Sequence, residues 1–404
     1  MGKIGKNSLD IQESNRLSIL RILAGEDVLT RAELSRRTGL KQATITNIIN
    51  DFLASGVVSE TGALKGNLGR RSIGIRINAE KFNVVAIKIA RRSYSVGIFN
   101  IKNQLLEKEY QKLDPAAGAS AVLERIVSDA RSLMQKYGSC CAVGVAVPGP
   151  YLRREGRIAV MTEFAGWEKI DICKQPVFVE HDANAGALGE WSRSANIGRD
   201  DVLVHLLASE GIGAGVVIGG KIISGYRGIF GEIGHMSINA MGPRCLCGNR
   251  GCLEMYCSAL ALVRDVQAGL PEHPESSLTS EQKITAEVIF RHMNAGDAYS
   301  RSAVLRTGHS LGCGVANLVN IYDPKEIVIS DVMSGGGEVM LQAVRESAKE
   351  RLLPEVWRDL TIRYSAVPED LILYGAASVA IDKILEKTDA FSPSGADAPE
   401  SKPL

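Results

Sequence analysis

Three cysteines and one histidine gather in a short glycine-rich stretch, and this cluster constrains the fold more than any other feature. His235 precedes Cys245, Cys247 and Cys252 in the run GHMSINAMGPRCLCGNRGCLE. One imidazole and three thiolates form a tetrahedral ligand set for Zn²⁺. Glycines beside the cysteines allow a tight loop to bring the sulfurs to one ion. Four protein ligands close the coordination shell, so we expect a structural zinc ion. The alternative is a group of free thiols near a surface loop.

The remaining cysteines are not part of a comparable Cys and His cluster in the sequence and are expected to fill the core. They are Cys140, Cys141, Cys173, Cys257 and Cys313. A disulfide framework is not expected in a chain of 404 residues without an apolar export segment. No apolar run reaches the ~18 residues that a membrane helix needs. The expected location is the cytoplasm.

The formal charge of +1 is unevenly distributed along the sequence. Residues 1–80 carry 12 Lys and Arg against 8 Asp and Glu, a net charge of +4. The remainder carries 35 against 38, a net charge of −3. A basic N-terminal part favours a polyanionic partner for that end of the chain.

The first 80 residues show the pattern of a winged helix-turn-helix. A first helix is expected over 14–24, with Ser14 as its cap, and a second over 31–38. Thr30 and Glu33 form a capping box before the second helix, and Gly39 suits its end. A third helix is expected over 41–55, because apolar residues recur there at helical spacing. Two strands follow, from Val57 and over 72–78.

The polar face of the third helix fits the major groove of DNA. Gln and Asn side chains pair with adenine, Lys pairs with guanine or phosphate, and Thr contacts methyl groups or phosphate. Arg70 and Arg71, beside the wing, are expected in a minor groove. The alternative is an amphipathic helix and a loop that meet only water. The residues expected to contact DNA on the third helix are Lys41, Gln42, Thr44, Thr46 and Asn47.

From Lys81 onward, strand-like runs alternate with helical runs, which indicates an α/β fold. The length of this part suits two lobes around a cleft. The expected domains are a DNA-binding domain over 8–79, a two-lobed domain over 80–387 and a Ser- and Pro-rich disordered tail over 388–404.

The run GEIGHMSIN…CLCGNRGCLE resembles the ROK family, which joins repressors and sugar kinases. VAVPGP (145–150), VEHDANAGALGE (179–190), LGCGVANLVNIYDPKEIVIS (311–330) and LILYGAASVAI (371–381) agree with it. The resemblance covers about residues 10–386. It implies an actin-like ATPase fold, of the ribonuclease H type, with sugar in the cleft. The winged helix places the chain on the repressor branch of the family.

The resemblance also implies a sugar site. Asp182 matches the carboxylate that takes a proton from a sugar hydroxyl in the kinases. Glu232 and Glu254 match positions that bind sugar hydroxyls, and His235 lies beside them. His181 stands where kinases usually have Asn. For Asp182 the alternative is a helix cap.

Three segments depart from the kinases of the family. Lys88-Ile89-Ala90-Arg91-Arg92 replaces the phosphate loop Asp-x-Gly-Gly-Thr, the segment 209–215 carries Glu210, and Asp331 follows the late strand where kinases have a glycine-rich turn. Phosphoryl transfer depends on positioning and charge neutralisation. We therefore expect no kinase activity and no bound ATP, and Asp182 as the remnant of a catalytic base.

The expected function is a sugar-responsive repressor of carbohydrate genes, for example those of xylose uptake and catabolism. It would bind a pseudo-palindromic operator as a homodimer or homotetramer and release it when a sugar inducer binds. One alternative is an active sugar kinase with a DNA-binding head. Another is a repressor controlled by a sugar-transport protein.

Overall fold

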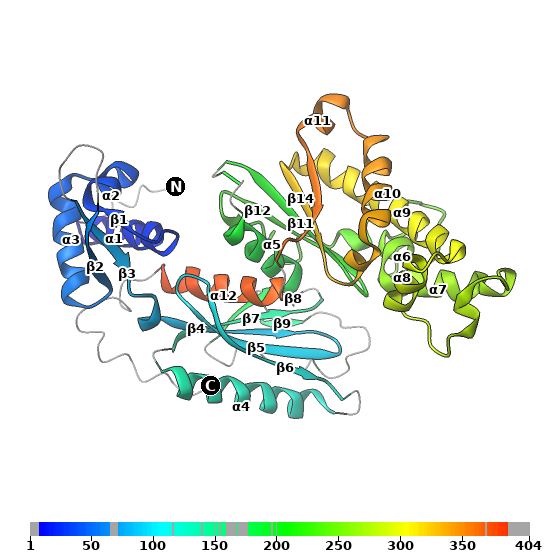
Figure 1. The fold of residues 1–404 in the computed structure, drawn as a ribbon, viewed down its shortest axis with the longest axis horizontal. Helices are drawn as coiled ribbons and strands as arrows, with labels where there is room; N and C mark the ends of the chain where they lie inside the picture. Colours follow the sequence, from blue (N-terminus) through cyan, green and yellow to red (C-terminus); the bar gives the residue numbers. More distant parts are fainter. Residues whose placement is uncertain are drawn as a thin grey trace. The chain divides into compact units, whose positions relative to one another are not determined.

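The computed structural model describes residues 8–64, 72–114, 117–138, 140–149, 151–152, 155–158, 167, 177–194, 197–198, 200–367 and 370–386. The chain divides into two compact units (Figure 1). Unit 1 comprises Met1–Val147, Met161–Glu180 and Ala376–Leu404, and unit 2 comprises Pro148–Val160 and His181–Gly375. The tail expected over 388–404 lies outside the described residues.

Unit 1 begins with a winged helix-turn-helix head. Its three strands form a sheet of order β1-β3-β2, in which β3 is antiparallel to both neighbours. Leu20, Leu34, Ile45, Ile49 and Phe52 are fully buried and hold the helices together. The elements of the head are α1 (Ser8–Ala24), β1 (Leu29–Thr30), α2 (Arg31–Thr38), α3 (Gln42–Ala54), β2 (Val58–Leu64) and β3 (Ser72–Ile77).

The ends of α2 follow from local signals in the sequence. The Thr30 side chain accepts a hydrogen bond from the Glu33 backbone, and the Glu33 carboxylate accepts one from the Thr30 backbone, which confirms the capping box. Gly39 ends the helix with φ +72°. The prediction of Ser14 as a cap is wrong. α1 begins at Ser8, and the carbonyl of Ser14 accepts a hydrogen bond from the Ser18 hydroxyl inside the helix.

The rest of unit 1 is built on a five-stranded sheet of order β10-β7-β4-β5-β6. β4 runs antiparallel to β5 and parallel to β7. α4 (Ala119–Tyr137) packs against β4 and β5 with an apolar stripe that includes Val122, Ile126 and Leu133 (Figure 1). The other elements are η1 (Ala79–Lys81), β4 (Asn83–Ile89), β5 (Ser93–Asn100), β6 (Leu105–Lys112), β7 (Cys140–Val147) and β10 (Phe178–His181).

Unit 2 contains a second five-stranded sheet, of order β13-β12-β11-β14-β15. β11, β14 and β15 are parallel, and β12 is antiparallel to β11. The strands of unit 2 are β8 (Tyr151–Leu152), β9 (Arg157–Ile158), β11 (Val202–Ala208), β12 (Ile212–Ile218), β13 (Lys221–Ile222), β14 (Glu326–Ser330) and β15 (Thr361–Tyr364).

Helices cover this sheet and form a helical part beside it (Figure 1). The boundary between the units falls within α12. These elements are α5 (Asp182–Arg193), η4 (Ile233–His235), α6 (Glu254–Cys257), α7 (Ala259–Gly269), η5 (Leu270–Glu272), η6 (Ser277–Ser280), α8 (Ala286–Asn294), α9 (Ala298–Tyr322), η7 (Val332–Gly336), α10 (Gly337–Lys349), α11 (Pro354–Asp359) and α12 (Leu371–Ile384).

α5 lies close to β12 because two glycines in the strand leave room for its backbone. A Cβ atom on Gly215 would lie 2.2 Å from the carbonyl oxygen of Ala183, and one on Gly213 would contact Ala183 and His181. Both glycines are strand residues. The two glycines leave room for the first turn of α5, which carries Asp182.

In the part of the chain that the structure describes, no helix combines the length and the apolar character needed to cross a membrane.

Candidate functional site

The loop that carries the three cysteines turns back tightly on itself in unit 2. Backbone bridges pair Ser237 with Cys252 and Arg244 with Arg250. The amide of Cys245 donates to the carbonyl of Asn249 at 2.9 Å. Gly251 has φ +64°, and a Cβ atom there would lie 1.7 Å from the carbonyl oxygen of Asn239, so only glycine fits.

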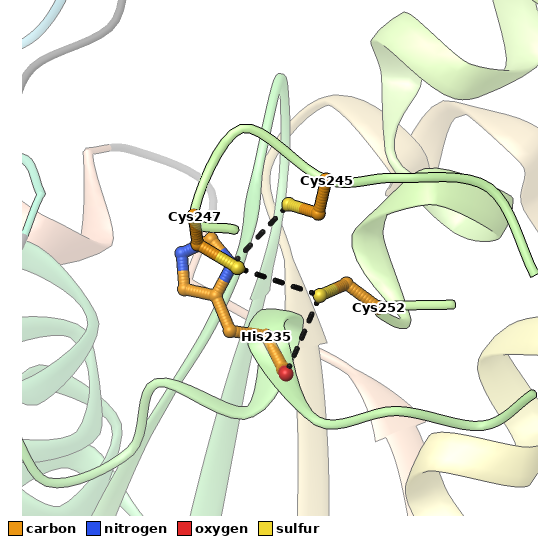
Figure 2. Close-up of side chains that lie close together, drawn as sticks. All are labelled: His235, Cys245, Cys247 and Cys252. Atoms are coloured by element: carbon orange, nitrogen blue, oxygen red, sulfur yellow. Dashed lines mark hydrogen bonds between the residues drawn. The ribbon is translucent and has the colours of Figure 1, made fainter. Parts of the chain in front are cut away.

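This loop brings the predicted metal ligands together, and their side chains converge in Figure 2. One ligand atom from each of His235, Cys245, Cys247 and Cys252 lies within 4.8 Å of the other three. Sγ of Cys245 lies 3.7 Å from Nδ1 of His235, and the Sγ atoms of Cys247 and Cys252 are 3.6 Å apart. Ligands at tetrahedral Zn–S distances lie ~3.8 Å apart. The chemistry and the spacing of these residues fit a zinc ion.

Glu254, at the start of α6, lies against two of the predicted metal ligands. Its Oε1 is 3.2 Å from Nδ1 of His235 and 3.1 Å from Sγ of Cys245. Sequence reasoning assigned this carboxylate to sugar hydroxyls and did not anticipate these contacts. A carboxylate beside metal-ligating groups fixes their orientation. Glu254 therefore contacts both His235 and the cysteine loop.

Glu232 directly precedes η4 and carries a carboxyl oxygen without a partner. Its Oε1 is buried and accepts no hydrogen bond from any residue that the structure describes. Burial raises the pKa of Glu232, and the nearby Asp182 and Glu254 carboxylates act in the same direction. His181 and His235 oppose this rise in pKa. A buried carboxyl oxygen without a donor is suited to a polyol hydroxyl.

His181 and Asp182 lie side by side where β10 ends and α5 begins. Nε2 of His181 is 3.1 Å from Oδ1 of Asp182, and the same oxygen accepts a hydrogen bond from the Ala183 amide at 2.7 Å. His181 occupies the cap position, and Asp182 is the first residue of the helix. A carboxylate at this position lies at the positive end of the helix dipole.

All five residues predicted to bind sugar therefore lie in one region of unit 2. The charges of His181, Asp182, His235 and Glu254 all act on Glu232. The result is a cluster of three carboxylates and two imidazoles beside the cysteine loop. We call it the acidic cluster.

The head presents most of the predicted DNA contacts on one surface. Lys41, Gln42, Thr46 and Asn47 are exposed, and Thr44 is half-buried. Asn50 is exposed one turn after Thr46 and Asn47 and is a further candidate. Asn50 follows these residues at i+3 and i+4, and this spacing in the sequence would have placed it on the same face of the helix. Arg70 and Arg71 lie outside the described residues.

The segment that replaces the phosphate loop forms a tight hairpin between β4 and β5 in unit 1. The amide of Ala90 donates to the carbonyl of Ser93 at 2.9 Å. Arg91 and Arg92 occupy the turn, where the kinases of the resemblance have glycines. The hairpin therefore lacks the glycines that open backbone amides to an anion in a glycine-rich loop.

Comparison with known proteins decides the family. The ROK family profile matches residues 84–383, and a profile described as winged helix-turn-helix DNA-binding matches residues 12–59. This chain belongs to the ROK family. The chain is 27% identical over 397 residues to the xylose repressor of Caldicellulosiruptor bescii, and the match covers 95% of this chain and 98% of the repressor.

Two solved structures share the fold of this chain. A ROK family transcriptional regulator, described as a homologue of the E. coli MLC protein, matches with a TM-score of 0.78 and 24% identity over 93% of this chain and 97% of its own. A ROK family glucokinase from Streptomyces griseus, in complex with glucose and AMPPNP, matches with a TM-score of 0.63 and 25% identity. The glucokinase match covers 99% of the glucokinase and 74% of this chain.

Proposed function

We propose that this ROK family protein is a sugar-responsive transcriptional repressor. The head binds operator DNA, and a sugar held by the acidic cluster lowers the affinity for the operator. The observation that carries this proposal is the presence in one chain of a DNA-binding head and an acidic cluster with an unpartnered carboxyl oxygen on Glu232. The full-length match to a xylose repressor supports the same combination.

The acidic cluster can recognise a sugar by accepting hydrogen bonds from its hydroxyl groups. An ionised carboxylate accepts hydrogen bonds and donates none. A neutral imidazole accepts on one nitrogen and donates on the other. Glu232 binds one hydroxyl through Oε1, Asp182 and Glu254 bind others, and His181 and His235 complete the set. D-xylose is the first candidate, because the similar repressor is named for it.

A structural zinc ion would hold the loop beside this cluster. His235, Cys245, Cys247 and Cys252 would bind it, and the ion would fix the orientation of the His235 ring. Zinc would thereby stabilise the arrangement of the side chains that bind the sugar. It has no part in a chemical reaction under this proposal.

The protein does not phosphorylate its sugar under this proposal. The hairpin of Arg91 and Arg92 replaces the glycines that let backbone amides approach a phosphate. Asp182 then serves as a hydrogen-bond acceptor and not as a catalytic base. A repressor acts where the chromosome is, so we place the protein in the cytoplasm.

On DNA, α3 would enter the major groove of an operator half-site. Asn47 and Gln42 would read base edges, Thr44 and Thr46 would contact methyl groups or phosphates, and Lys41 would bind a phosphate. Arg70 and Arg71 would reach a minor groove. A homodimer or homotetramer would bind a pseudo-palindromic site. The sugar acts only through its different affinity for the DNA-bound and free forms.

A thermal-shift panel on the zinc-loaded protein tests the sugar site. It would compare D-xylose, glucose, mannose, allose, N-acetylglucosamine and N-acetylmannosamine, with the 6-phosphates of the hexoses. A ligand at 100 times its Kd adds about 2.7 kcal/mol to the free energy of unfolding. We expect one sugar to raise the Tm and Glu232→Ala to abolish the rise. If no sugar shifts the Tm, the proposed sugar site is wrong and a protein effector takes its place.

A further inference from the structure

His205 is a buried imidazole in the middle of an otherwise apolar strand. It lies in β11, whose sequence is VLVHLLA, and its exposed fraction is 0%. A buried polar group is costly unless it forms hydrogen bonds. Both ring nitrogens of His205 have a partner, one in α5 and one in β14. The ring therefore joins its own strand to two further elements of unit 2.

The two hydrogen bonds fix which nitrogen of the ring carries the proton. Nδ1 of His205 lies 3.0 Å from the carbonyl oxygen of Ala183, and Nε2 lies 2.7 Å from the hydroxyl oxygen of Ser330. A carbonyl oxygen only accepts hydrogen bonds, so Nδ1 donates to Ala183 and Nε2 accepts from Ser330. Ser330 thereby stabilises the tautomer that binds the backbone of α5.

Ser330 is itself held in place at the end of β14. It is the last residue of this strand and lies opposite Leu207 of the parallel strand β11. The next residue, Asp331, accepts a hydrogen bond from the hydroxyl of Ser209 at 2.9 Å. Ser209 comes just after β11, so this bond joins the ends of the two strands. The ring of His205 therefore binds to a well-supported part of the sheet.

α5 accommodates the ring at a glycine. A Cβ atom on Gly186 would lie 2.2 Å from Cε1 of His205, so only glycine lets the ring come this close to the helix. Glycine within a helix is destabilising relative to alanine, and the space that the ring needs accounts for it here. On the neighbouring strand β12, Gly215 approaches the Ala183 carbonyl just as closely. The Ala183 carbonyl is therefore held by both strands.

Ala183 also binds the carboxylate of Asp182. Its amide donates to Oδ1 of Asp182 at 2.7 Å, and the same oxygen lies 3.1 Å from Nε2 of His181. The residue at the cap position of α5 forms no side-chain hydrogen bond to the helix. The carbonyl and the amide of Ala183 belong to one residue of a helical turn. A displaced carbonyl therefore shifts the amide that binds the Asp182 carboxylate.

We infer that His205 is a positioning residue for the sugar site, because it holds the residue whose amide binds the Asp182 carboxylate. Binding groups are effective only where supporting residues keep them in the productive geometry. The inference rests on the proposed function, since Asp182 is one of the groups proposed to bind the sugar. It assigns part of the sugar affinity to a buried side chain that acts through Ala183.

The test measures sugar affinity and helix protection on the full-length zinc-loaded protein. Calorimetric titration with D-xylose, and then with the other sugars of the panel, gives the Kd. Hydrogen exchange without sugar reports on the first turn of α5. His205→Leu removes both hydrogen bonds and should speed this exchange. It should also weaken sugar binding at least about tenfold, the lower end of the effect of outer-shell partners at metal sites. His205→Asn should bind sugar more tightly than His205→Leu, because its amide can donate from the place of Nδ1.

Leu206→Ala is the matched control. Leu206 is equally buried in β11, and successive side chains of a strand point to opposite faces of the sheet. The control should lower the Tm and leave the sugar Kd and the exchange of the first turn unchanged. Ser330→Ala removes only a hydroxyl and keeps the test valid if His205→Leu does not fold; it too should speed the exchange and weaken sugar binding.

Two results would overturn the inference. One is wild-type exchange of the first turn in both His205→Leu and Ser330→Ala. The other is an equal loss of sugar affinity in these variants and in Leu206→Ala, which would make the effect a general loss of stability. If wild type binds none of the sugars, the proposed function is wrong, and the exchange measurement still decides whether His205 holds the turn that carries Asp182.

Discussion

Nζ of Lys81 donates a hydrogen bond to the carbonyl oxygen of Ser55, the residue that ends α3, at a distance of 2.6 Å. The Asn78 side chain donates to the next carbonyl, that of Gly56, at 2.7 Å. Only Phe82, which is buried, separates Lys81 from β4. The end of α3 is therefore tied to the segment that leads into the first strand of the adjoining sheet within unit 1. A cation at the negative end of a helix is also electrostatically favourable.

Removing the hydrogen bond between Lys81 and Ser55 should reduce the effect of sugar binding on operator affinity. We expect Lys81→Met to reduce the factor by which a saturating sugar lowers operator affinity, while the Kd for the sugar stays unchanged. The physical reason is that α3 loses its charged hydrogen bond to the segment that leads into β4. Fluorescence anisotropy with labelled operator measures the factor. Lys108→Met, at an exposed position on β6, is the matched control. An unchanged factor in Lys81→Met would contradict the role of this link.

The metal prediction is tested by removing one sulfur. Cys252→Ser should lose most of the bound zinc and the thermal shift caused by the sugar, because the remaining ligands no longer close a tetrahedral shell. Metal content is measured by elemental analysis of the purified protein. Cys141→Ser, on β7 of unit 1, should keep both properties. Equal zinc content in the two variants would refute the proposed ligand set.

Contacts to DNA should divide into base reading and phosphate binding. Asn47→Ala should weaken operator binding by about 1–3 kcal/mol and relax the preference at one base pair. Lys41→Ala should weaken binding to all sequences alike and reduce the slope of log K against log salt by about 1. Each variant serves as the control for the other in a salt titration with operator and scrambled DNA. Identical behaviour of the two variants would contradict this division.

His205 should make unit 2 sensitive to acid. The fully buried ring lies 3.0 Å from the Ala183 carbonyl and 2.7 Å from the Ser330 hydroxyl. A carbonyl only accepts, so Nδ1 carries the proton and Nε2 accepts from Ser330. Burial lowers the pKa of His205 below 6.5. The unfolded chain therefore binds this proton more readily than the folded chain.

The expected result is a loss of stability as the pH falls below about 6.5, the ordinary pKa of histidine, by at most about 1.4 kcal/mol per pH unit from this residue. Stability from His205 is fully present above that pH and decreases until the folded pKa is reached. Thermal unfolding between pH 8 and pH 5 measures it. His205→Gln should show a shallower dependence on pH than wild type. A steeper or equal dependence would show that the ring does not titrate as described.

The local parts of the fold could be predicted from the sequence. The capping box of Thr30 and Glu33, the turn at Gly39 and the apolar stripe of the third helix are all short-range patterns, and the structure reproduces each. The metal cluster could also be predicted, because its ligands lie within one short loop. Ser14 was misplaced as a cap because the helix already includes the residues from Ser8 onward, so Ser14 lies inside it.

The long-range parts could not be predicted, because they depend on which strands and loops meet in space. The bond from Ser209 to Asp331 requires the parallel pairing of β11 and β14. The bond from Lys81 to Ser55 requires the chain to return to the end of α3. The contacts of Glu254 with His235 and Cys245 depend on the exact course of the cysteine loop. Sequence patterns identified these residues as polar or acidic and left their partners undetermined.

The most direct test of the account measures operator affinity with and without sugar at one fixed salt concentration. Sugar, first D-xylose and then the other members of the panel, should lower the affinity of the zinc-loaded protein at least about fivefold. Glu232→Gln should require about tenfold more sugar for the same effect, since a charged acceptor becomes neutral. Glu287→Gln, on the exposed surface of α8, should behave as wild type. Operator affinity that no sugar changes would contradict the account.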